Sequence, residues 1–210
     1  MKVIQAVLII GFCLARVSQA STIRVEPDDF PNLSTITVEG VTLTLADIDD
    51  QIRPDSTIIS LTQFGFPSTG HSFFGGRTSG GFTGLFFLNA QLRADFASLV
   101  QVVSIDFIGC CNVPSEPATT IGVLRAFDSS GVPIGSFTTS PLLRGVVETG
   151  TIARPNAEIA YILASIRDDS NATSLDNLIA STVPEPDEIA LLGAGLVVGV
   201  LCRRRIHQPE

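Results

Sequence analysis

Residue types that perform most enzymatic and metal chemistry are scarce in this sequence of 210 residues, which holds two histidines, four cysteines, one tyrosine and no tryptophan. His71 lies close to Ser68 and Ser72, and a histidine acting as general base on a serine is the core of many hydrolase sites. Serines so local in the chain do not predict a catalytic triad, and the sequence offers no close pair of carboxylates. We therefore predict no catalytic residues and no enzyme activity, with a secreted hydrolase as the least favoured alternative.

The only adjacent cysteines are Cys110 and Cys111, since Cys13 and Cys202 lie near the two ends of the chain. In an oxidising compartment the pair can form a vicinal disulfide, a strained ring that would rigidify the loop before Pro114. The alternative is two reduced thiols on opposite sides of an extended backbone. We predict no metal ligands here, because a structural zinc site needs four ligands and this loop has no histidine.

Three residues carry oxygens of the kind that calcium prefers: Asp128, Asp176 and Asn177. They do not form the consecutive Asp-x-Asp-x-Asp pattern of a calcium-binding loop. The favoured interpretation is that Asp128 opens a turn and that Asp176 or Asn177 caps a β-bulge. We therefore predict no cofactor, with a structural calcium ion as the alternative.

Acidic residues outnumber basic ones, 21 to 13, which gives a formal charge of −8. This balance argues against nucleic acid as a partner, because phosphate backbones are bound by basic surfaces. A local group of acidic residues surrounds Arg53 and consists of Asp47, Asp49, Asp50 and Asp55. Such a group is typical of a solvated loop, and the alternative is that it attracts cations.

Residues 64–87 are rich in phenylalanine and glycine. The favoured interpretation packs the phenylalanines over one mouth of the fold, where glycines allow tight turns. The alternative is an exposed aromatic loop on a concave polymer-binding face, although phenylalanine lacks the polar group of tyrosine and tryptophan. Its candidate residues are Phe64, Phe66, Phe73 and Phe82.

Residues 21–182 alternate apolar and polar residues between turn sequences spaced about ten residues apart. This pattern, with no long amphipathic helix, predicts an all-β domain built as a single β-sandwich. Residues 92–100 have some helical character, and we assign them to strand or loop. The predicted strands are 35–39 and 41–45, joined at Gly40 as a hairpin or as two edge strands, then 57–64, 102–108, 119–127, 132–138, 145–152, 159–166 and 174–180.

The N-terminus has the layout of a secretory signal peptide. Lys2 precedes the apolar run 3–14, and small and polar residues follow up to Ala20. The run is too short for a membrane-spanning helix, which needs about 20 residues. We predict that residues 1–20 form a signal helix and that cleavage occurs between Ala20 and Ser21.

Residues 183–210 contain a proline motif, an apolar helix and a basic cluster. The prolines favour an extended backbone, which suits entry into a protease groove. At about 1.5 Å per residue the helix covers about 21 Å, short of the roughly 30 Å hydrocarbon core of a membrane. The basic cluster would hold its far end on the cytoplasmic side. These components are Val183, Pro184, Glu185 and Pro186, then the run 189–202, then Arg203, Arg204 and Arg205.

This order of parts resembles the PEP-CTERM sorting signal of Gram-negative bacteria that make exopolysaccharide. Asp187 and Glu188 follow the motif where small or hydroxyl residues are usual, and residues 206–210 trail the arginines. The resemblance implies that exosortase and the secretion machinery are partners and that the C-terminal hydrophobic helix contacts the membrane only before the tail is cut. The alternative is an ordinary tail anchor.

Residues 105–107, 124–128 with Gly131, 159–162 and 175–178 resemble the jelly-roll ectodomain common in PEP-CTERM proteins, which implies a lectin-like architecture. We therefore expect a protein of the cell surface or extracellular matrix, outside the inner membrane, with a structural or adhesive role in exopolysaccharide or biofilm. The alternative is a carbohydrate-binding module, with or without a stabilising calcium ion.

Overall fold

The strands form three antiparallel sheets in the computed structural model, which describes residues 21–47, 49–62, 70, 72–83, 86, 90–109, 120–166 and 173–182. Among these residues, no helix is long and apolar enough to cross a membrane. Several predictions fall outside the described residues: the signal and sorting segments, His71, Phe64, Phe66, Cys110 and Cys111.

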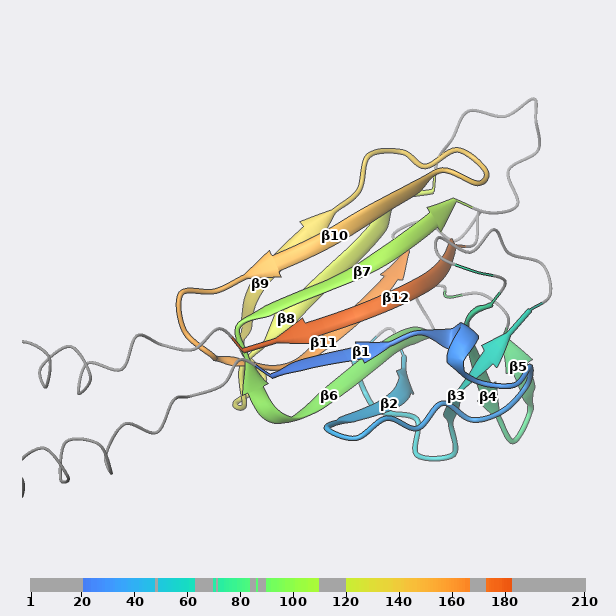
Figure 1. Ribbon diagram of the computed structural model, residues 1–210, viewed down its shortest axis with the longest axis horizontal. Helices are drawn as coiled ribbons and strands as arrows, with labels where there is room; N and C mark the ends of the chain where they lie inside the picture. The colour runs from blue at the N-terminus through green and yellow to red at the C-terminus, as the bar shows by residue number, and fades with distance from the viewer. Residues whose placement is uncertain are drawn as a thin grey trace, which may run out of the picture. The chain divides into compact units, whose positions relative to one another are not determined.

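Four strands form the first sheet, in the order β1-β12-β7-β10 (Figure 1). β1 (Thr22–Val25), which the sequence pattern did not predict, pairs with β12 (Thr173–Ser181). β12 pairs with β7 (Val102–Gly109), and β10 (Val147–Ala153) pairs with the other side of β7. The first and last strands of the domain are therefore neighbours.

Five strands form the second sheet, in the order β2-β6-β11-β8-β9. Residues 92–100, which have some helical character in sequence, form a strand, since β6 spans Gln91–Val100. The others match predicted strands to within a few residues: β2 (Val41–Ala46), β11 (Ile159–Ile166), β8 (Gly122–Phe127) and β9 (Pro133–Thr138).

The two large sheets lie face to face and enclose one hydrophobic core, as the front and rear layers of Figure 1 show. Alternation along β7 turns Ile105 and Phe107 inward, and alternation along β8 turns Leu124 and Ala126 inward; all four are fully buried. Burying each large apolar side chain contributes about 1.5–3 kcal/mol. The prediction of an all-β sandwich is confirmed for the described part of residues 21–182, and the predicted flanking helices lie outside the described residues.

The prediction of a strand over residues 35–39 is wrong. This segment makes two isolated bridges in place of a strand. Its Ile36 is buried in the core, and the Ile36 backbone N donates to Ile58 O at 2.9 Å. The segment therefore runs beside β3 (Thr57–Leu61), where Ile36 is buried, and turns back at Gly40 through the isolated bridge between Val38 and Val41.

The phenylalanine-rich segment contains two strands that the sequence analysis placed in a loop. β4 (Phe73–Thr78) pairs with β3 and with β5 (Gly81–Thr83) to form the third, small sheet. Phe73 is fully buried, so the favoured packing interpretation holds for it, and the alternative of an exposed binding face is wrong for this residue. Of Phe82 the structure describes only the backbone.

Candidate binding site on the five-stranded sheet

The second face of the five-stranded sheet carries polar and aromatic side chains. Successive residues of a strand point to opposite faces, so Arg93 and Asp95 point away from the core that Leu92 and Ala94 fill. The same alternation holds along β8 and β11. We call seven of these residues the outer face: Gln91, Arg93, Asp95, Arg125, Phe127, Tyr161 and Leu163.

Strand register places the two arginines on either side of one buried residue. Leu163 of the central strand β11 pairs with Arg93 of β6 and with Arg125 of β8. Leu163 is fully buried although it points away from the main core, and it packs in a small second apolar cluster with Ala46 and Phe127. The outer face therefore has an apolar base with charged groups around it.

A pair of stacked rings occupies the next row of the outer face. Phe127 and Tyr161 are register partners on β8 and β11, and their ring centroids lie 4.7 Å apart with planes 4° from parallel. The guanidinium carbon of Arg93 lies 3.8 Å from the centroid of the Tyr161 ring. Stacking and cation–π contact contribute on the order of 1 kcal/mol each, which fixes the orientation of Tyr161.

Both arginines of the outer face are held by carboxylates in two-point contacts. Arg93 donates from Nε and Nη2 to the two carboxylate oxygens of Asp95, at 2.8 and 2.6 Å. Arg125 donates from Nη1 to Asp50 Oδ2 at 2.9 Å and from Nη2 to Asp50 Oδ1 at 2.6 Å. Gln91 Oε1 also accepts from Arg125 Nη2, at 2.9 Å. Such paired geometry fixes the planes of the guanidinium groups.

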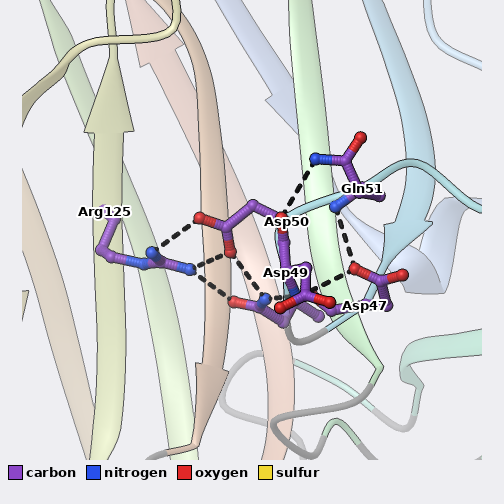
Figure 2. Close-up of polar contacts among 6 residues, drawn as sticks. Asp47, Asp49, Asp50, Gln51 and Arg125 are labelled. Carbon is purple, nitrogen blue, oxygen red and sulfur yellow. Dashed lines mark hydrogen bonds and ion pairs between the residues drawn. The ribbon is translucent and has the colours of Figure 1, made fainter.

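Asp50 reaches Arg125 from the connection after β2, as Figure 2 shows. We call Asp47, Asp49, Asp50 and Gln51 the Asp50 loop. The Asp47 Oδ1 atom accepts the backbone N–H groups of Asp49 and Gln51, each at 3.0 Å. Asp50 itself has φ 63°, a left-handed conformation that aspartate tolerates better than most residues. The loop is thus shaped by its own hydrogen bonds to direct the Asp50 carboxylate at the sheet.

The electrostatics of the site favour the ionised form of Asp50. Burial by itself raises the pKa of this carboxyl, but hydrogen bonds from Arg125 and Gln91 and the positive charges of Arg125 and Arg93 outweigh it. The pKa of Asp50 therefore lies below its ordinary value. For Arg93, hydrogen bonding to Asp95 raises the pKa further.

This lowered pKa predicts how the stability of the Asp50 loop depends on pH. A group whose folded pKa is depressed adds stability above its unfolded pKa and loses it as the pH falls through the folded pKa. We expect the wild type to unfold at a higher temperature than Asp50→Asn at about pH 6, with the difference shrinking as the pH falls below about 4, the ordinary pKa of aspartate. Thermal unfolding of both proteins across this range measures it; a difference that stays constant with pH would contradict the ion pair.

An open hollow of about 570 Å³ adjoins the outer face, which is within the roughly 300–1,000 Å³ typical of small-ligand sites. Gly131 borders the hollow with φ 80°, and a Cβ there would make ordinary van der Waals contact with the Tyr161 hydroxyl at 3.5 Å. The hollow joins a charged pair to an apolar surface. Its lining residues are Asp50, Arg125, Phe127, Gly131, Pro133, Gly135 and Ser136.

Of the four aspartates predicted to surround Arg53, Asp47, Asp49 and Asp50 lie together in the Asp50 loop, and Asp55 lies apart from them. Asp47 shapes the Asp50 loop, and Asp50 belongs to the hollow. Asp55 lies elsewhere and accepts the Ser79 hydroxyl at 2.6 Å, and hydrogen bonds from Ser79 lower the pKa of Asp55.

The oxygens considered for calcium lie in two places, the turn between β8 and β9 and the strand β12. Asp128 Oδ1 accepts the backbone N–H groups of Ser130 and Val132 at 2.8 and 2.9 Å, which confirms that it opens the turn before β9. Asp176 and Asn177 lie where the register of β12 shifts, which confirms the predicted bulge. Among the described residues, no group of three or more His, Cys, Asp or Glu is arranged to hold a metal ion.

The sequence pattern predicts strands for Arg125, Phe127, Tyr161 and Leu163 and strand or loop for Arg93 and Asp95, leaves Gln91 outside the predicted strands, and singles out none of them as a site. One signal was present: Arg93 and Asp95 alternate with Leu92, Ala94 and Phe96, which marks a strand with a charged second face. The partners of those charges depend on which strands become neighbours in the sheet. The local sequence pattern does not predict the order of the strands.

Comparison with known proteins gives distant structural likenesses only. No family model and no curated protein matches the chain. The K1 cleaved adhesin domain of Lys-gingipain from Porphyromonas gingivalis is 13% identical, with a TM-score of 0.43 over 78% of this chain and 99% of that chain. The C-terminal family 22 carbohydrate-binding module of Clostridium thermocellum Xyn10B is 12% identical, with a TM-score of 0.43 over 77% and 93%.

A family 29 carbohydrate-binding module from Piromyces equi is 10% identical, with a TM-score of 0.40 over 80% of this chain and 95% of that chain. Likeness at this level does not identify a ligand for the present protein.

Proposed function

We propose that this chain is an exported protein whose β-sandwich binds polysaccharide at the outer face and the adjoining hollow. The observation that carries the proposal is the lining of the hollow, which joins the Asp50–Arg125 pair, fixed in plane by its two-point contact, to the apolar side chains of Phe127 and Pro133. A sugar ring has apolar C–H faces and a rim of hydroxyls. An apolar surface bordered by oriented donors and acceptors complements both.

The hollow gives the proposal a direct test by steric block. Ser136 is exposed, lines the hollow and is the register partner of Arg125. We expect Ser136→Ile to reduce binding of the full chain to polysaccharide beads, because the added methyl groups occupy the space of the ligand. The measurement is depletion of the protein, in mild detergent, by beads carrying different polysaccharides.

Thr138→Ile is the matched control. Thr138 lies two residues further along the same strand, on the same face and exposed, but it does not line the hollow. Equal loss of binding in both variants, or no loss in either, would contradict a site in the hollow. If the wild-type chain binds no polysaccharide, the domain has a structural role without this ligand.

For the route of export we propose signal cleavage after Ala20 and exosortase processing near Pro184, Glu185 and Pro186, with release to the cell surface or matrix. The support is the order of segments in the sequence and the meeting of the domain's two ends. Thr182 N donates to Ser21 O at 3.0 Å, so both predicted cuts lie just beyond the last paired residues. The intact mass of the protein recovered from its host tests this: a retained tail would contradict it.

A further inference from the structure

The charge of each arginine on the outer face is cancelled by a carboxylate. Arg93 faces Asp95 and Arg125 faces Asp50, each in a two-point contact. The Asp50–Arg125 pair is the charged part of the hollow itself, and both side chains are about one-third exposed, at 31% and 33%. A ligand that enters the hollow therefore meets a fixed but neutral set of donors and acceptors.

An anionic sugar is a poor match for this arrangement. A uronate carboxylate would need two adjacent N–H groups of Arg125, but three of the five already donate, two to Asp50 at 2.6 and 2.9 Å and one to Gln91 at 2.9 Å, so only single N–H groups remain for a hydroxyl. The formal charge of −8 adds repulsion of anionic polymers at longer range. A neutral sugar meets neither obstacle, since its hydroxyls can donate to Asp50 and accept from Arg125 without separating them.

We infer that the ligand is a neutral polysaccharide and that Asp50 is the residue that excludes acidic ones. The inference rests on the proposed function. Asp50 occupies the position on Arg125 that the carboxylate of an acidic sugar would need. The structure holds it there with a left-handed backbone and with Gln91 Nε2, which donates to Asp50 Oδ1 at 3.0 Å.

Asp50→Asn tests this inference as a switch of specificity. Asparagine accepts the left-handed backbone, so the loop conformation is retained, while Arg125 loses its counter-charge. We expect the wild-type chain to bind at least one bead among neutral glucan, mannan and galactan, and to bind neither polygalacturonate nor alginate. We expect the variant to bind the neutral polymer about tenfold more weakly and to gain binding to polygalacturonate that weakens with salt.

Asp55→Asn is the control, because it removes the same charge from a residue that contacts Ser79 and does not line the hollow. It should leave both specificities unchanged. Unfolding temperatures of all three proteins show that each is folded. A second measurement needs no variant: neutral-polymer binding by the wild type should change less than about twofold between roughly 0.05 and 0.5 M salt.

The outcomes separate the two proposals. Wild-type binding to acidic polymers alone would overturn the inference and leave the proposed function standing. No binding to any polymer would overturn the proposed function. A folded Asp50→Asn that keeps the wild-type preference would overturn the role of Asp50.

Discussion

Phe107→Ala is expected to destabilise the domain by about 3–5 kcal/mol, the usual cost of removing a large aromatic side chain from a core. Phe107 is fully buried between the two large sheets. Its ring fills space that two glycines leave open: a Cβ on Gly122 would lie 2.3 Å from Phe107 Cδ1, and one on Gly150 would lie 2.9 Å from Phe107 Cε2. Chemical unfolding followed by circular dichroism measures the loss.

The same packing predicts that the effects of two substitutions are not additive. Gly122→Ala alone should destabilise by about 1–3 kcal/mol, because the new methyl group overlaps the ring. In the Phe107→Ala background the same change should cost little, since the methyl group then enters the cavity. Gly131→Ala serves as a comparison, because its strain comes from φ 80° and not from Phe107. Additive costs at Gly122 and Phe107 would contradict the packing described.

Arg125→Ala is expected to weaken polysaccharide binding by about 10–100-fold, which corresponds to about 1.5–3 kcal/mol for a charge-assisted hydrogen bond. The substitution removes the donor of the hollow and also leaves Asp50 without its counter-charge. Isothermal titration with a soluble form of the bound polysaccharide measures the change in Kd.

The chain offers a closely matched control in Arg154→Ala. Arg154 pairs with Glu158, and their exposures of 34% and 35% are near those of Arg125 and Asp50. Arg154 belongs to the connection between β10 and β11 and does not line the hollow. Its loss should leave Kd unchanged. If the two variants bind equally well, Arg125 does not touch the ligand.

Much of the fold follows from the alternation of residues along each strand. The predicted strand 159–166 matches β11, because Ile162 and Ala164 alternate with outward residues and both ends carry turn sequences. The misassigned segments are those in which tertiary packing decides. Ile36 is drawn into the core beside β3, and Phe73 lies in a strand rich in glycine, a composition that local preference assigns to loops.

The candidate site could not be predicted from the sequence for a different reason. Asp50 and Arg125 are 75 residues apart and meet only because the Asp50 loop lies over a sheet in which β8 is two strands away from β6. Alternation predicts that Arg125 and Phe127 share a face, but no local pattern states that β11 lies between β8 and β6. The hollow is a product of that strand order.

Hydrogen–deuterium exchange of the full chain, with and without the neutral polysaccharide that it binds, tests the location of the site most directly. We predict that the ligand slows exchange in the backbone of residues 131–136 and in the Asp50 loop, and leaves β7 and β12 of the opposite sheet unchanged. Slower exchange confined to β7 and β12, or binding with no change near residues 131–136, would contradict a binding site on the outer face.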